Sequence, residues 1–136
     1  MTKIPKKVLI ADDDKIFCKI FKDSLHRDYP EKYEVVTASD GEEGLKLAME
    51  INPDLIVLDL KMPKMDGMEV LKALKEKGIV PKTPVLISTN FSDMEKMSEG
   101  FELGIKGYVV KSDYSLEGIE HRIADILEIQ DEDAGK

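Results

Sequence analysis

The chain has 136 residues, which is enough for one domain with a sizeable core, and its 42% hydrophobic and 35% charged residues exclude a disordered polymer. A net charge of -8 argues against general binding to DNA or RNA, which requires a basic surface. A single cysteine, Cys18, excludes a disulfide framework, and the absence of a long apolar run or signal-peptide pattern favours a soluble, cytoplasmic protein.

Short, continuous apolar runs alternate along the chain with segments of helical periodicity. Continuous apolarity is typical of strands that are covered on both faces, as in parallel sheets. In chain order, the pattern predicts strand 8–11, helix 15–28, edge strand 33–37, helix 41–51, strand 55–58, helix 67–77, strand 85–87, helix 93–103, strand 108–110 and helix 116–128. Five strands alternating with five helices predict a doubly wound α/β fold.

Polar residues mark the starts of the predicted helices. Asp14 and Ser115 are good N-cap residues, and the segments 66–69 and 92–95 have the spacing of capping boxes. The inner face of the first helix is expected to hold Phe17, Ile20, Phe21 and Leu25. We expect one domain over residues 1–129, followed by an acidic tail at 130–136 that frays.

Chemically active side chains follow the predicted strands. The first strand ends in Asp12-Asp13-Asp14, the third in Asp59, the fourth in Ser88-Thr89-Asn90 and the fifth in Lys111. Ligands of open α/β sheets gather beyond the carboxyl ends of the strands, so these groups are expected to converge. Clustered carboxylates repel one another, and an all-oxygen ligand set suits Mg²⁺, which in turn favours phosphoryl chemistry.

Four motifs in order give the chain a family resemblance. They are Val8-Leu-Ile-Ala-Asp-Asp-Asp14, Asp59-Leu-Lys-Met-Pro-Lys-Met-Asp-Gly67, Val85-Leu-Ile-Ser-Thr89 and Gly107-Tyr-Val-Val-Lys111. Together they resemble the receiver domain of response regulators in two-component signalling, of the chemotaxis-regulator type, over about residues 6–128. The resemblance implies a flavodoxin-like (βα)5 fold with strand order 2-1-3-4-5.

The resemblance also implies roles for the site residues. Asp59 matches the phospho-acceptor, which takes a phosphoryl group from a phosphohistidine of a histidine kinase or phosphotransfer protein. Asp13, Asp59 and the backbone carbonyl of Lys61 match the direct Mg²⁺ ligands, and Asp12 matches the acid that holds the metal through water. Lys111 matches the lysine that pairs with the phosphoryl group.

Two further positions match a conformational switch. Thr89 corresponds to the hydroxyl that moves toward the phosphate, and Tyr108 to the aromatic residue that turns inward with it. The resemblance then implies that phosphorylation biases a two-state equilibrium of the face built from residues 91–125, which contacts a downstream protein target. Such a domain phosphorylates itself from a donor and has weak autophosphatase activity, but it is not a classical enzyme.

The chain departs from the family pattern near the site. Ser112 replaces the usual proline after Lys111, so we expect a trans peptide there and a different loop shape. Asn90 replaces a small residue after the switch hydroxyl. Lys61 and Phe91 occupy positions at which the family tunes dephosphorylation, and a bulky Asn90-Phe91 pair is hypothesised to shield the phosphate from water.

Several alternatives remain open at this stage. We expect a stand-alone receiver, a monomer or a weak phosphorylation-driven dimer, but a domain cut from a longer regulator fits the same residues. The pair Asp12-x-Asp14 also mimics a Mg²⁺-dependent phosphatase, in which Asp59 would have no role. A degenerate scaffold and a flavin-binding module fit less well, because the acids and lysine are present and no glycine-rich phosphate loop follows the first strand.

Overall fold

A computed structural model describes residues 4–90 and 95–135 of the chain. Its strands form one parallel sheet in the order β2-β1-β3-β4-β5. The strands are β1 (Lys6–Ala11), β2 (Tyr33–Ala38), β3 (Leu55–Asp59), β4 (Val85–Thr89) and β5 (Gly107–Val110). The doubly wound fold and the strand order are therefore confirmed, and β2 lies at an edge as expected.

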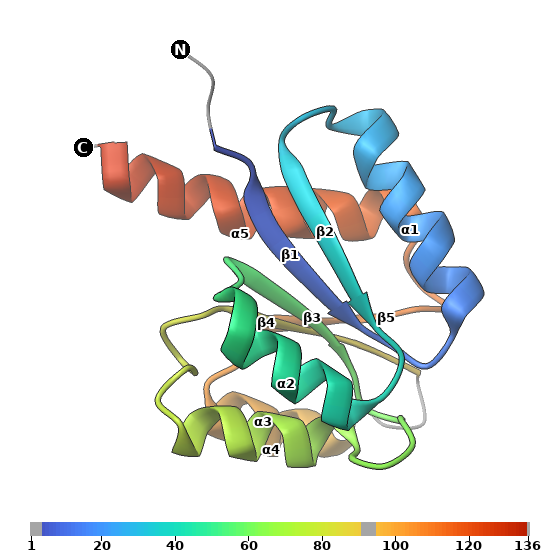
Figure 1. Ribbon diagram of the computed structural model, residues 1–136, viewed down its shortest axis with the longest axis vertical. Helices are drawn as coiled ribbons and strands as arrows, with labels where there is room; N and C mark the ends of the chain where they lie inside the picture. The colour runs from blue at the N-terminus through green and yellow to red at the C-terminus, as the bar shows by residue number, and fades with distance from the viewer. Residues whose placement is uncertain (1–3, 91–94, 136) are drawn as a thin grey trace.

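Helices cover both faces of the sheet. Figure 1 shows α1 (Lys15–Asp28) and α5 (Leu116–Gly135) on one face, and α2 (Gly41–Ile51), α3 (Gly67–Glu76) and α4 (Met97–Leu103) on the other. Strand residues alternate between the two resulting cores. Val57 and Leu86 belong to the core under α1 and α5, called here the α1–α5 core, and Leu58 and Ile87 belong to the α2–α4 core.

The sequence places most helix starts correctly. The Asp14 side chain accepts a hydrogen bond from Phe17 N, and Asp66 and Glu69 form the predicted capping box of α3. The predicted start of the fourth helix at residue 93 lies outside the described residues. In the described part, α4 begins at Met97 after a 3₁₀ turn at 95–96, a tighter geometry that is common at helix ends. The capping-box residue Ser92 lies outside the described residues.

The last helix is longer than predicted. The backbone of α5 is helical through Gly135, past the predicted end at residue 128 and through most of the segment expected to fray. Within the described ranges, no helix has the length and apolarity needed to cross a membrane.

Candidate functional site

The ends of β1 and β3 bring three carboxylates together. Both strands end at the same edge of the sheet, since Ala11 pairs with Leu58 in parallel register. One oxygen from each of Asp12, Asp13 and Asp59 lies within 4.8 Å of the others, and Asp12 and Asp59 are buried whereas Asp13 is exposed. The predicted convergence of these acids is confirmed.

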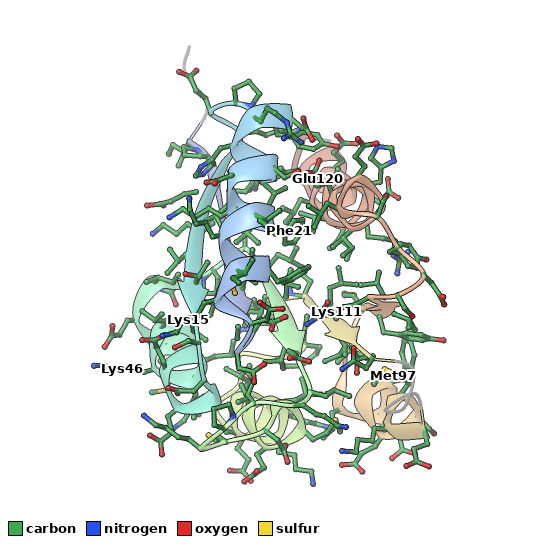
Figure 2. The ribbon with its side chains drawn as sticks, turned by 90° about the vertical axis from the view of Figure 1, so that its right-hand side faces the viewer. Lys15, Phe21, Lys46, Met97, Lys111 and Glu120 are labelled. Carbon is green, nitrogen blue, oxygen red and sulfur yellow. The ribbon has the colours of Figure 1, made fainter. Side chains whose placement is uncertain are left out.

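Lys111 lies across this cluster from the loop after β5. Its Nζ lies 2.6 Å from Asp12 Oδ2 and 3.7 Å from Asp59 Oδ2. Figure 2 shows the lysine side chain directed toward the first turn of α1, where Nζ lies 4.7 Å from the centroid of the Phe17 ring. The aromatic face and the carboxylates together hold the ammonium group at the site.

The two buried acids are held differently. Asp12 Oδ1 accepts a hydrogen bond of 2.9 Å from Asp14 N, and its Oδ2 takes the short contact to Lys111. Among the described residues, Asp59 Oδ1 accepts one hydrogen bond, a long one of 3.4 Å from Lys61 N. Asp12 is thus firmly oriented, whereas Asp59 keeps lone pairs available to react.

Burial controls the ionisation of the site. Burial, and then the negative charge of Asp12, raise the pKa of Asp59 to about 7, while Lys111 opposes the shift. Burial lowers the pKa of Lys111, but its hydrogen bond to Asp12 and the surrounding acids outweigh this effect and raise it overall. The lysine therefore stays charged at neutral pH. Its single positive charge does not balance the three carboxylates of the cluster.

A glycine and a rigid loop set the position of Asp59. Gly67 N donates to Leu60 O at 2.8 Å, which folds the loop between β3 and α3 back onto the end of the strand. A Cβ at Gly67 would overlap the Asp59 carbonyl oxygen, so only glycine permits this approach. Beside the loop lies a hollow of about 470 Å³ lined by Asp13, residues 60–63, Asp66 and Lys96.

The predicted switch residues lie on the next two strands. Thr89 is fully buried, and its hydroxyl donates to Asn90 O at 3.4 Å. Tyr108 is half-buried and contacts Phe101 edge to face, with ring centroids 6.2 Å apart. Neither side chain has a hydrogen bond to the acidic cluster among the described residues.

The remaining predicted positions surround the site. Lys61 and Asn90 are exposed, and Phe91 lies outside the described residues. The Lys111–Ser112 peptide is trans, as expected, since the one cis bond in the described part of the chain is Val80–Pro81. Asp14 Oδ1 accepts a hydrogen bond of 3.0 Å from Phe17 N, so Asp14 has the predicted role of N-cap of α1.

Sequence reasoning missed two contributors to the site. The sequence predicts Phe17 only as a residue of the inner face of the first helix, and it predicts no contact between Cys18 and the site. Cys18 is buried, its thiol donates to Asp12 O at 3.5 Å, and burial raises the pKa of the thiol to about 12. Neither residue type signals such a role, because the contacts depend on how the first turn of α1 packs over the strand ends.

Comparisons with known proteins agree with this geometry. The family model of the response regulator receiver domain matches residues 8–124. The chain is 38% identical over 122 residues to the alkaline phosphatase synthesis transcriptional regulatory protein PhoP of Bacillus subtilis, covering 90% of this chain and 48% of that protein. The chain thus spans about half the length of the curated relatives it matches.

Solved structures give the same result. The receiver domain of the Francisella response regulator 1452 matches with a TM-score of 0.80 and 32% identity, covering 92% of this chain and 98% of that one. The Vibrio cholerae chemotaxis protein CheY4 matches with a TM-score of 0.78 and 32% identity, covering 89% and 98%. The chain belongs to the receiver domain family of two-component response regulators.

Proposed function

We propose that Asp59 is the phospho-acceptor of this receiver domain and that a phosphohistidine of a histidine kinase or phosphotransfer protein is its donor. An Asp59 oxygen forms a bond to phosphorus while the P–N bond breaks, and the electron pair stays on the histidine nitrogen. The observation that carries the proposal is the arrangement of Asp59: buried, loosely hydrogen-bonded, and within 3.7 Å of Lys111. Lys111 then pairs with the transferred phosphoryl oxygens.

The acidic cluster suits Mg²⁺. Its donors are hard carboxylate oxygens within 4.8 Å of one another, and burial together with the negative charge of Asp12 raises the pKa of Asp59, a cost that a bound cation would offset. Asp13, Asp59 and the Lys61 carbonyl would hold the ion directly, and Asp12 would hold it through water. When bound, the ion supplies positive charge that neutralises the transferred phosphoryl group.

The response of the domain is assigned to Thr89 and Tyr108. A buried hydroxyl at the end of β4 and a half-buried ring on β5 lie on neighbouring strands, since Ile87 pairs with Tyr108. Movement of Thr89 toward a phosphoryl group at Asp59 would favour the inward position of Tyr108 and reshape the face of residues 91–125. Lys61, Asn90 and Phe91 would tune the lifetime of the acyl phosphate.

This function places the domain among signalling proteins rather than classical enzymes. It would act in the cytoplasm as a domain of residues 1–129, as a monomer or a weak phosphorylation-driven dimer. Its partners would be the phosphohistidine donor and a downstream protein target, with no nucleic acid and no membrane. The acidic net charge of -8 supports protein partners over DNA for this chain.

The test is the intact mass of the protein after incubation with Mg²⁺ and acetyl phosphate. One phosphoryl group is expected on the wild type, and none on Asp59→Asn or when EDTA is present. The matched control is Asp14→Asn, which changes a nearby acid that follows β1 and caps α1. An adduct that persists in Asp59→Asn would contradict the assignment of the acceptor.

A further inference from the structure

Ser88 carries a buried hydroxyl that has no hydrogen-bond partner among the described residues. Its side chain is 1% exposed, and its Oγ finds neither donor nor acceptor. A polar atom buried in this way costs free energy, so a structural or functional reason is expected. Nothing in the roles assigned above uses this residue.

The sheet places Ser88 beside Asp59. The two residues are direct partners in the parallel register of β3 and β4, and neighbouring strands lie about 4.8 Å apart. Val57 and Leu86, two positions earlier on their strands, both belong to the α1–α5 core. Because side chains alternate along a strand, Asp59 and Ser88 also point to that side of the sheet.

The Asp59 carboxylate has room for a further donor. Its recorded partners are Lys61 N at 3.4 Å and Lys111 Nζ at 3.7 Å, both long contacts for a buried anion. Asp12, in contrast, takes two contacts of 2.9 Å or less. The Ser88 hydroxyl is a neutral O–H donor on the neighbouring strand, and it lies on the same side of the sheet as the less satisfied of the two acids.

We propose that the Ser88 hydroxyl is a positioning group that hydrogen-bonds the Asp59 carboxylate, stabilises it as the leaving group in acyl-phosphate hydrolysis and so shortens the lifetime of the phosphorylated state. The inference rests on the proposed role of Asp59 as phospho-acceptor. Ser88 itself transfers no proton and forms no covalent bond.

The chemistry gives the effect a direction. In hydrolysis a water oxygen bonds to phosphorus, the bond between phosphorus and Asp59 breaks, and the electron pair returns to the carboxylate, while the water proton ends on the released phosphate. Phosphoryl transfer has a loose transition state, in which the bond to Asp59 is largely broken and the carboxylate charge has nearly returned. A hydrogen bond to the carboxylate is stronger in this transition state than in the acyl phosphate, because the oxygen carries more negative charge. The hydrogen bond therefore lowers the barrier to hydrolysis.

Formation of the acyl phosphate responds differently. In that direction the carboxylate is charged both before the reaction and in the loose transition state, so the hydrogen bond stabilises the two states nearly equally. Removing the Ser88 hydroxyl should lengthen the lifetime and leave the rate of phosphorylation almost unchanged. General damage to the site would slow phosphorylation as well.

The experiment compares wild type, Ser88→Ala and Ser88→Thr with acetyl phosphate and Mg²⁺, following the phosphorylated mass with time before and after the donor is removed. We expect Ser88→Ala to dephosphorylate roughly tenfold more slowly, the effect of one lost hydrogen bond to a charged group. Phosphorylation should proceed at nearly the wild-type rate, and Ser88→Thr, which restores the hydroxyl, should regain the wild-type lifetime.

The control is Ser24→Ala, which removes another buried serine hydroxyl at the seam between α1 and α5, away from the acidic edge. Its lifetime should equal that of the wild type, and thermal unfolding shows that each variant is folded. An unchanged or shorter lifetime in Ser88→Ala overturns the inference, as does a Ser88→Thr variant that behaves like Ser88→Ala. Failure of the wild type to gain a phosphoryl group would instead overturn the proposed acceptor.

Discussion

Asp59 links the electrostatics of the site to the stability of the molecule. Its pKa is raised from 3.8 to about 7, first by burial and then by Asp12. A carboxyl group whose pKa is raised on folding contributes stability below its unfolded pKa, and this contribution is lost as the pH rises through the folded value. In metal-free protein the loss should fall between about pH 4 and pH 7, and it amounts to at most about 4 kcal/mol.

Asp59→Asn should therefore be more stable than the wild type at pH 8 without divalent cations, and nearly equal to it at pH 4. The amide carries no charge to bury, and Lys111 keeps its short contact to Asp12. Urea unfolding of both proteins in EDTA at several pH values measures the difference. Two curves that run parallel from pH 4 to pH 8 would contradict the raised pKa of Asp59.

At the residue scale, the sequence predicts the acids and Lys111 but not their surroundings. Asp12, Asp13, Asp59 and Lys111 follow predicted strands, and a parallel sheet brings such ends together whatever the details of packing. The cation–π contact of Phe17 was not predictable, because it depends on the angle at which α1 crosses the sheet.

At the scale of elements, α1 shows where helical periodicity is insufficient. Ile20 was expected on the inner face but is 50% exposed, whereas Cys18, which was not, is buried. Helical periodicity shows which side of a helix faces the core, but it does not settle residues at the border of that side. The packing of α1 against the sheet decides which of these border side chains is buried. Ile16 is also exposed, at 73%, so two large apolar side chains lie one turn apart on the helix that begins beside the acidic cluster.

We expect this exposed apolar pair on α1 to contact the protein that donates the phosphoryl group. Ile20→Glu should lower the rate of transfer from a phosphohistidine protein by roughly tenfold or more, as expected for a central apolar contact of an interface. Labelling by acetyl phosphate should not change, because the small donor needs no docking surface. Radiolabel transfer from a kinase that phosphorylates the wild type measures the first rate, and intact mass the second.

The matched control for that substitution is Ile4→Glu, at an isoleucine that is 89% exposed and precedes β1, at the opposite edge of the sheet from the acidic cluster. The Ile4→Glu variant should accept the phosphoryl group from the kinase at the wild-type rate. Equal transfer to Ile20→Glu and wild type would show that the donor docks elsewhere.

The contact between α1 and α5 is another feature that the sequence pattern does not predict. Ser24 on α1 donates to the buried carboxylate of Glu120 on α5, and Arg27 donates to Ser24 Oγ at 3.3 Å. Figure 2 shows Glu120 facing α1 across the seam. Burial raises the pKa of Glu120. The contact joins residues 96 positions apart, and periodicity would assign a glutamate on α5 to the solvent.

At the scale of the whole molecule, the acidic cluster and the predicted switch residue Tyr108 lie on different sides of the sheet. The acidic cluster lies beside the first turn of α1, whereas Tyr108 packs against the α2–α4 core and contacts Phe101, which is 50% exposed on α4. If Asp59 is the acceptor as proposed, its signal must cross from one side of the sheet to the other. Thr89 is suited to carry it, because it is fully buried at the end of β4 and Lys111 N donates to its carbonyl at 2.8 Å.

Because Tyr108 lies away from the acidic cluster, a fluorescent residue beside it can report the conformational response. The chain contains no tryptophan, so Phe101→Trp introduces a single indole that contacts Tyr108. Acetyl phosphate and Mg²⁺ should change its fluorescence in proportion to the phosphorylated fraction measured by mass, because an inward movement of Tyr108 alters the packing around the indole. Adding Thr89→Ala should leave phosphorylation in place and remove most of the fluorescence change. A change that persists in the double variant would mean that the signal crosses the sheet by a route independent of the Thr89 hydroxyl, and β3 or the loop before α4 would then have to carry it.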